Sequence, residues 1–316
     1  MSYVIDKQLL EKLNSLQPQL AAFPDFTPGD PLGWRTRANA LYELSNLQLP
    51  FQEGLKTTEL TIPFQAQTLR ARRYSPESSL TGGVVLYVHG GGGVAGNIEL
   101  YDKLIRIYAY QSETDFISLE YGLAPETPGV IQTEQVLAAI NWLQTHSEEL
   151  GIDAERIVLM GDSGGGGIAA SAALLARDRK IKLAGLVMVY PMLDHKTETV
   201  SPELAPYLSV TAEEVRTAWD ARLGDGVPES RLYAVSPASA KNYAGLAPVY
   251  LDVGELDLFC RENMDWVGKA STAAVPVESH LYPGVNHGFE LIAPNSDVAR
   301  QAFDLRARAI RRMMAL

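Results

Sequence analysis

The sequence predicts an α/β fold in which a mostly parallel sheet is flanked by helices. From residue 84 onward, short apolar runs alternate with longer stretches that have helical periodicity. Such alternation is typical of parallel strands joined by crossover helices. The run Val84–Val88 is apolar throughout, as expected of a strand that is buried on both faces. These two patterns together predict the fold class.

The first ~50 residues are expected to be helical. Leu9, Leu10, Leu13 and Leu16 recur at helical spacing, and a second periodic stretch covers Arg35–Leu47. Prolines between the two stretches separate them into two helices.

The remaining elements follow in order along the chain. Thr58–Phe64 and Thr68–Tyr74 alternate polar and apolar side chains, which predicts two strands near a sheet edge. Later strands are predicted at Val84–Val88, Phe116–Glu120, Ile157–Met160, Ala184–Tyr190, Pro248–Val253 and Val277–Tyr282. Helices are predicted at Tyr101–Ser112, Val130–His146, Gly164–Arg179, Glu262–Ala273 and Asp297–Met313, with a helix-prone insertion at about Ser201–Leu223. Ligands of such sheets bind beyond the carboxyl ends of the strands.

Composition and charge argue against several classes of protein. The 316 residues include 27 basic and 38 acidic side chains, a net charge of -11. This sign argues against nucleic-acid binding and against an anionic membrane surface. The single cysteine, Cys260, excludes an intrachain disulfide and a cysteine-based zinc site. The longest apolar stretch, about nine residues around Gly185–Leu193, is too short to span a bilayer, and the first residues do not resemble a secretory leader, so we expect a cytoplasmic protein.

A candidate nucleophile lies between a predicted strand and a predicted helix. Gly161-Asp162-Ser163-Gly164-Gly165 has the pattern G-x-S-x-G in the strand–turn–helix context of a nucleophile elbow. The glycines are needed because larger side chains would collide with backbone when Ser163 sits on a tight turn. Helix N-termini also favour developing negative charge. A glycine-rich turn that binds a phosphate, or that only packs tightly, is the alternative interpretation.

A glycine run follows the strand Val84–Val88 directly. His89-Gly90-Gly91-Gly92 offers backbone N–H groups that could converge on one oxygen, as acyl transfer through a tetrahedral intermediate requires. Gly91 and Gly92, together with the N–H of Gly164, are therefore the candidate oxyanion hole. His89 is expected to orient this loop rather than to move protons.

A serine nucleophile needs a base and an acid that orients the base. Among the five histidines, His287 follows the strand Val277–Tyr282 through a turn at the carboxyl edge, and it is the candidate base. Asp257 lies beyond the preceding strand and is the candidate acid, preferred over Glu255. Asp252 lies inside that strand, which favours a structural role.

Taken together, these motifs resemble the hormone-sensitive-lipase-like branch of the α/β-hydrolases, the bacterial family IV esterases. Segments 89–92 and 161–165 match its oxyanion loop and its elbow, and segments 254–257 and 287–289 occupy the places of its acid and base. Tyr121-Gly-Leu-Ala-Pro-Glu126 is similar to its Tyr-Arg-Leu-Ala-Pro-Glu segment. The resemblance spans roughly residue 80 to the C-terminus.

The resemblance implies an eight-stranded sheet and hydrolysis of short- to medium-chain carboxylic esters through an acyl-enzyme, without a metal or cofactor. It also implies a helical cap over the pocket. The cap would comprise residues 1–50 and an insertion at about 195–225 of a catalytic domain that covers 51–316. The partner would be a small-molecule ester, and a second copy could pair at the edge of the last strand to form a homodimer.

The sequence departs from the family pattern at three positions. Gly164 stands where the family usually has Ala, Gly122 where it has Arg, and Leu258 where many members have Pro. None of these differences removes a catalytic group.

The substrate pocket is harder to predict than the catalytic residues. Trp34, Tyr207 and Trp219 could wall it, and His195 and Leu258 lie near strand ends, although ordinary packing explains each of them equally well. Three other functions are consistent with the motifs: an amidase or peptidase with the same triad, a non-catalytic small-molecule receptor, and a phosphate- or nucleotide-binding protein. The presence of His287 argues against the receptor, and the absence of G-x-x-x-x-G-K-[ST] argues against the nucleotide site.

Overall fold

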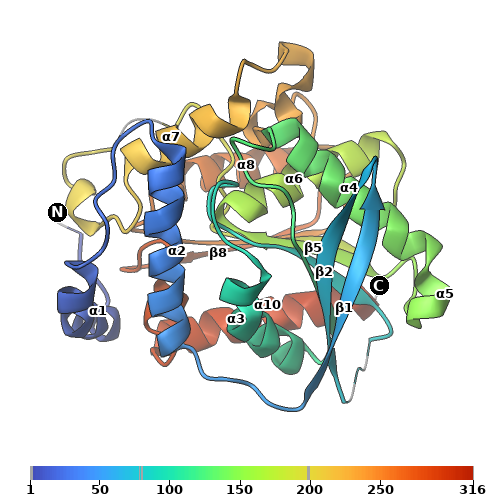
Figure 1. Ribbon diagram of the computed structural model, residues 1–316, viewed down its shortest axis with the longest axis horizontal. Helices are drawn as coiled ribbons and strands as arrows, with labels where there is room; N and C mark the ends of the chain where they lie inside the picture. The colour runs from blue at the N-terminus through green and yellow to red at the C-terminus, as the bar shows by residue number, and fades with distance from the viewer. Residues whose placement is uncertain (1–2, 78, 80, 198–199, 316) are drawn as a thin grey trace.

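The computed structural model describes residues 3–77, 79, 81–197 and 200–315 of the chain (Figure 1). It begins with two helices, α1 (Lys7–Leu20) and α2 (Pro31–Gln48). Each helix has an aspartate at its N-cap. The side chain of Asp6 accepts a hydrogen bond from the N–H of Leu9. The side chain of Asp30 accepts hydrogen bonds from the N–H groups of Leu32 and Gly33. These contacts satisfy amides that the first helical turn leaves unpaired.

Within the described residues, eight strands form one sheet in the order β1-β2-β4-β3-β5-β6-β7-β8. The pairs β1–β2 and β2–β4 are antiparallel, and the pairs from β4 across to β8 are parallel. The strands are β1 (Leu55–Phe64), β2 (Gln67–Pro76), β3 (Val84–Val88), β4 (Asp115–Leu119), β5 (Ile157–Asp162), β6 (Gly185–Val189), β7 (Val249–Gly254) and β8 (Val277–Tyr282). The predicted fold class is confirmed.

Helices cover both faces of the sheet. Figure 1 shows α3 (Ile98–Ser112) and α10 (Asp297–Ala315) on one face, and α4 (Gly129–Thr145), α6 (Ser163–Asp178) and α8 (Cys260–Thr272) on the other. The shorter elements are α5 (Ser147–Leu150), α7 (Ala212–Leu223), α9 (Phe289–Ile292) and the 3-10 turns at Ala205–Tyr207, Glu229–Ala234 and Pro237–Ser239.

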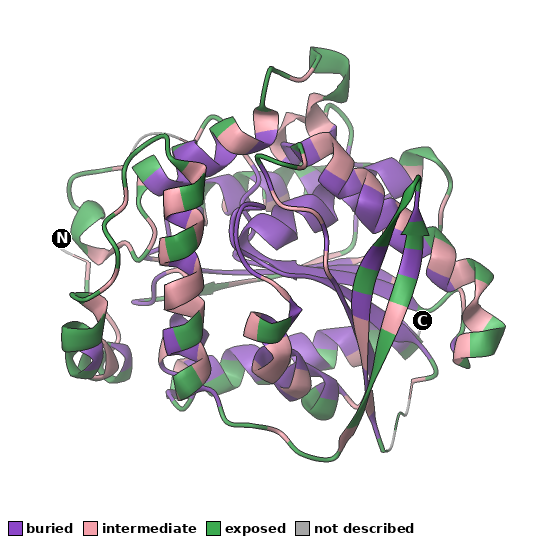
Figure 2. Cartoon of the chain, in the orientation of Figure 1, coloured by how far each residue is buried: buried purple, intermediate pink, exposed green. Residues whose placement is uncertain are grey.

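The core lies along the central strands. Every residue of β3, β4, β5, β6 and β7 is buried (Figure 2). In β1, exposed and buried residues alternate over the last four positions of the strand. Two-sided burial explains why the sequences of the central strands are mostly apolar. No helix in the described part of the chain combines the length and apolarity needed to cross a bilayer.

A buried ion cluster ties the last helix to the carboxyl edge of the sheet. Arg306 of α10 donates from Nε and Nη2 to the two carboxylate oxygens of Asp252, at 2.7 and 2.9 Å, and from Nη1 to Glu290, at 2.6 Å. All three side chains are fully buried. Glu290 lies three residues after His287, so the cluster anchors the segment that carries the candidate base.

The segments predicted to form a cap lie together at one end of the molecule. The Gly29 N–H donates to Oγ1 of Thr217 at 2.9 Å, and Arg37 of α2 pairs with Glu214 of α7 at 3.3 Å. Within the insertion the long helix begins only at residue 212, where Thr211 and Glu214 form a capping box. Residues 198 and 199 of the predicted insertion lie outside the described residues, and the division into cap and catalytic domain stays a prediction.

Candidate active site

Ser163 lies on a tight turn between β5 and α6, with a positive φ of 49°. A Cβ at Gly161 would lie 2.5 Å from the carbonyl oxygen of Gly165. A Cβ at Gly165 would lie 2.2 Å from that of Val88 and 2.3 Å from that of His89. The turn therefore requires glycine at both positions, and it presents the Ser163 side chain at the carboxyl edge of the sheet.

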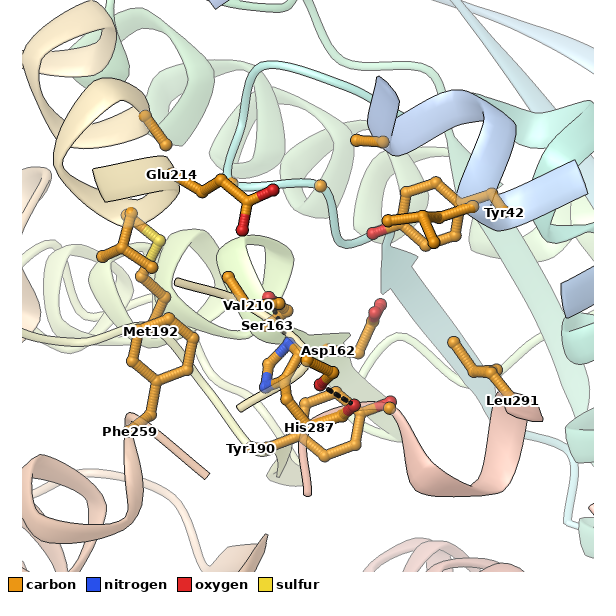
Figure 3. A pocket seen from close by; sticks show the side chains of 18 of the residues that line it. Tyr42, Asp162, Ser163, Tyr190, Met192, Val210, Glu214, Phe259, His287 and Leu291 are labelled. Atoms are coloured by element: carbon orange, nitrogen blue, oxygen red, sulfur yellow. Dashed lines mark hydrogen bonds between the residues drawn. The ribbon is translucent and has the colours of Figure 1, made fainter. Parts of the chain in front are cut away.

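The structure brings Ser163, His287 and Asp257 together. Nε2 of His287 lies 2.9 Å from Oγ of Ser163, and Nδ1 lies 2.8 Å from Oδ2 of Asp257. Figure 3 shows the imidazole pointing at the serine hydroxyl. Because a carboxylate only accepts hydrogen bonds, Nδ1 carries the proton and Nε2 is left to accept from the hydroxyl.

The structure also distinguishes the two candidate acids. Asp257 is 1% exposed, and its second oxygen, Oδ1, accepts from the N–H of Phe259 at 2.9 Å. Glu255 instead accepts from the N–H of Gly284 at 3.0 Å. Asp257, and not Glu255, is thus the carboxylate that contacts the imidazole.

The environment of His287 makes it a stronger base. Burial alone would lower the pKa of its imidazole, but the charge of Asp257 and the hydrogen bond to it outweigh burial, so the pKa lies above the ordinary value of 6.5. The ring is enclosed by the Tyr190 and Phe259 rings, with centroids 4.4 and 5.3 Å away.

The glycine loop after β3 faces the serine. Gly91 and Gly92 have positive φ angles of 97° and 61°, and both line the cavity that contains Ser163. Among the described residues, no backbone carbonyl accepts from the N–H of either glycine. A Cβ at Gly164 would lie 2.4 Å from Cα and 2.5 Å from N of Gly92, so the loop packs directly against the first turn of α6. Alanine, the usual family residue at position 164, would require this loop to shift.

His89 holds the same loop from behind. Its Nδ1 lies 2.9 Å from the carbonyl oxygen of Gly90, and its ring stacks on Tyr121 at a centroid distance of 4.3 Å. The hydroxyl of Tyr121 donates to the carbonyl of His89 at 2.8 Å. Complete burial lowers the pKa of His89 to about 4, so the ring is neutral at physiological pH. These contacts agree with a role in orienting the loop.

Asp162 is a buried acid beside the nucleophile. Its carboxylate accepts from the hydroxyls of Tyr87, at 2.8 Å, and Tyr101, at 2.9 Å. Burial raises the pKa of Asp162 to about 6, although both hydrogen bonds oppose the increase.

The cavity in front of Ser163 holds about 860 Å³ of space, including its open mouth. Its wall is mostly apolar, with side chains from α2, from the segment that leads into α7, and from α9 (Figure 3). Its lining includes Trp34, Ala38, Leu41, Tyr42, Ser45, Met192, Ser209, Val210, Glu214, Val215, Ala218, Phe259, Leu291 and Ile292.

One of the five predicted pocket residues lies in this wall. Trp34 lines the cavity and is 7% exposed. Tyr207, Trp219, His195 and Leu258 are not part of its lining, so a substrate-binding role for these four stays a prediction.

The four residues are engaged elsewhere. The hydroxyl of Tyr207 donates to the carbonyl of Tyr3 at 3.0 Å, and Nδ1 of His195 lies 3.0 Å from Oγ of Ser236. Trp219 packs beneath the Arg222 guanidinium, and Leu258 is buried in an apolar cluster. On α7 it is Glu214, Val215 and Ala218 that face the cavity.

The wall that α2 contributes corresponds to a helical spacing in the sequence. Trp34, Ala38, Leu41, Tyr42 and Ser45 recur at i, i+4, i+7, i+8 and i+11, which is one face of a helix. Leu291 and Ile292 follow the candidate base by four and five residues.

The chain belongs to the α/β-hydrolase fold family. Residues 85–291 match the family model described as "alpha/beta hydrolase fold", and this range includes all three residues that converge at the elbow. Together with the relatives described next, the match confirms the predicted membership in the hormone-sensitive-lipase-like branch and the class of carboxylic ester hydrolases.

Known relatives are esterases by name. The chain is 31% identical over 251 residues to esterase LipI of Mycobacterium tuberculosis (strain ATCC 25618 / H37Rv). The aligned region covers 76% of this chain and 77% of the relative. The structure of a bacterial heroin esterase has a TM-score of 0.86, with 29% identity over 98% of both chains. An esterase from the bacterial hormone-sensitive lipase family shares the fold, with a TM-score of 0.84 and 24% identity over 98% of this chain and 99% of that one.

Proposed function

We propose that this chain hydrolyses short- to medium-chain carboxylic esters through an acyl-enzyme, with Ser163, His287 and Asp257 as its triad. The observation that carries the proposal is the position of His287, 2.9 Å from Ser163 and 2.8 Å from Asp257. This is the geometry in which one imidazole takes a proton from a hydroxyl while a carboxylate fixes its tautomer.

In the first half of the reaction, Oγ of Ser163 attacks the ester carbonyl as Nε2 of His287 takes the hydroxyl proton. The carbonyl oxygen becomes an oxyanion, which accepts from the N–H groups of Gly91, Gly92 and Gly164. When the carbonyl re-forms, the bond to the alcohol oxygen breaks and His287 delivers its proton to that oxygen. The products are the free alcohol and an acyl-serine.

In the second half, water replaces the alcohol. His287 takes a proton from the water as its oxygen attacks the acyl carbon, and the same amides hold the second oxyanion. Collapse breaks the bond to Oγ of Ser163, which regains its proton from His287. The free acid leaves, and the cycle balances with one water consumed for each ester.

The cavity and its surroundings support a small, mostly apolar ester as substrate. Trp34, Met192 and Phe259 supply apolar surface around the serine, and pockets of this kind bind ligands by burying them. The proposal includes a cap made of α1, α2 and the segment around α7. It also includes a cytoplasmic location and no cofactor. A second copy could pair at the edge of β8 to form a homodimer.

The experiment compares wild type with Ser163→Ala and Ser171→Ala on p-nitrophenyl butyrate. Ser171 lies in the same helix, and its Oγ has no hydrogen-bond partner among the described residues, so its replacement is a matched control. We expect Ser163→Ala to abolish turnover and Ser171→Ala to retain it. Equal turnover of wild type and Ser163→Ala would contradict the proposal.

A second comparison separates esters from amides. p-Nitrophenyl butyrate and p-nitrobutyranilide carry the same acyl group on leaving groups of similar shape. We expect rapid cleavage of the ester and little cleavage of the anilide. Faster cleavage of the anilide would instead identify an amidase.

A further inference from the structure

Arg222 is a buried cation that forms no ion pair with any carboxylate among the described residues. Its side chain, from α7, is fully buried, and Nη1 has no hydrogen-bond partner among the described residues. Its contacts are with neutral groups: Nε donates to Oε1 of Gln132 at 3.3 Å, Nη2 donates to the carbonyl of Val235 at 3.3 Å, and the guanidinium lies 4.8 Å above the Trp219 ring. Burial of an unpaired charge is costly, so its retention calls for an explanation.

The guanidinium lies against the glycine loop. A Cβ at Gly93 would lie 2.9 Å from Cδ and 3.1 Å from Nε of Arg222, so the side chain packs on the residue that follows Gly92. Burial lowers the pKa of Arg222 to about 10, which still leaves it protonated at physiological pH. The positive charge therefore lies beside Gly93, the residue that follows the proposed oxyanion donors Gly91 and Gly92.

Gln132 links this cation to the loop. Its Nε2 donates to the carbonyl of Gly93 at 2.6 Å and to that of Gly122 at 3.0 Å, and its Oε1 faces Arg222. Only one orientation of the amide satisfies two carbonyls and one guanidinium. Arg222 therefore supports the orientation that the carbonyls of Gly93 and Gly122 also favour, and Gln132 in turn holds the carbonyl of Gly93. The Ala124 N–H donates to the same oxygen at 2.8 Å, which completes its coordination.

We propose that Arg222 is a positioning residue for ester hydrolysis, which holds the oxyanion loop through Gln132 and places a positive charge beside that loop. Such a charge favours the transition state over the bound ester, because negative charge develops on the carbonyl oxygen only during the reaction. The inference rests on the proposed function. It also means that a helix outside the sheet scaffold helps to build the catalytic machinery.

The test uses substitutions that keep the size of the side chain. Arg222→Met removes the charge and the donors, Arg222→Lys keeps the charge, and Gln132→Met breaks the link to Gly93. Arg216→Met is the matched control, because Arg216 lies on the same helix and is exposed. Thermal unfolding checks that each variant is folded, and kcat and KM are measured separately with p-nitrophenyl butyrate.

We expect Arg222→Met to lower kcat by about 10- to 100-fold with KM changed by less than about threefold, somewhat below the effect of removing a direct oxyanion donor. Affinity for an alkyl trifluoromethyl ketone, which forms a tetrahedral oxyanion on the serine, should fall in parallel. Arg222→Lys should retain more activity than Arg222→Met, and Arg216→Met should equal wild type.

Two results would overturn the inference. One is a folded Arg222→Met variant with kcat within about twofold of wild type, and the other is an equal loss in Arg222→Met and Arg222→Lys. If Arg222→Met does not fold, Gln132→Met decides: a lower kcat at unchanged KM supports the inference, and unchanged kcat refutes it. A wild type that hydrolyses no ester would instead refute the proposed function, so the two failures are distinguishable.

Discussion

Nδ1 of His287 lies 2.8 Å from Oδ2 of Asp257, which is fully buried behind it. The contact joins the end of β7 to the turn after β8, two neighbouring parallel strands. It fixes the imidazole tautomer, and the charge of Asp257 is the largest of the effects that raise the pKa of His287 above its ordinary value.

The pH dependence of activity follows from this contact. His287 must be neutral to accept the serine proton, and its raised pKa places the acid limb of kcat/KM above the ordinary 6.5. Asp257→Asn removes the charge that raises the pKa, so the limb should move to lower pH. The loss of the correct tautomer should also reduce kcat by roughly 10³- to 10⁴-fold. The pH profile of kcat/KM measures both effects.

Glu255→Gln is the control for this prediction. It removes a carboxylate two residues away that does not contact the imidazole. Its acid limb should stay where the wild type has it. A limb that moves equally in Glu255→Gln and Asp257→Asn would show that Asp257 has no special relation to His287.

Trp34 is expected to limit the size of the substrate. It is 7% exposed, and a Cβ at Gly92 would lie 2.7 Å from Cη2 of its ring, so the indole stands directly beside the proposed oxyanion loop. Trp34→Ala should open this wall. The ratio of kcat/KM for p-nitrophenyl octanoate to that for p-nitrophenyl acetate should increase about tenfold, which is the scale of discrimination by a methylene or two in an apolar pocket.

Trp142→Ala provides the comparison, since Trp142 stacks on His146 at 4.6 Å and does not line the cavity. It should leave the octanoate-to-acetate ratio unchanged. If folded Trp34→Ala also leaves the ratio unchanged, Trp34 does not limit the substrate.

The buried cluster around Arg306 predicts a stability effect. Arg306→Met would leave the carboxylates of Asp252 and Glu290 without their cation, and breaking a buried pair in this way costs about 3–5 kcal/mol. Urea unfolding should show a decrease of this size in the free energy of unfolding. Arg308→Met, on the same helix, removes an exposed pair with Asp304 and should change it by less than about 1 kcal/mol. Similar losses for the two variants would contradict the account.

Local patterns in the sequence indicate which residues meet at the elbow. The elbow glycines and the glycine loop are contiguous in sequence, and each follows an apolar run that could only be a buried strand. The end of each parallel strand then places Asp257 and His287 at the same edge as Ser163, as the known behaviour of such sheets requires.

The direction of the cap side chains was not predictable in the same way. Ala218 faces the cavity and Trp219 does not, and this depends on how α7 is rotated against α2 and α4. Trp219 instead packs beneath the Arg222 guanidinium, within an apolar cluster. The contact between Arg222 and Gln132 joins residues 90 apart in the chain, and no local pattern indicates it.

The central claim is that Ser163 is a nucleophile activated by His287. The most direct measurement is intact-mass and peptide mass spectrometry after treatment with a fluorophosphonate, which reacts with activated serines. The account predicts one covalent adduct on the peptide that contains Ser163 in the wild type, none in Ser163→Ala, and greatly slowed labelling in His287→Ala. Labelling of another serine, or labelling of Ser163 at the same rate without His287, would contradict it.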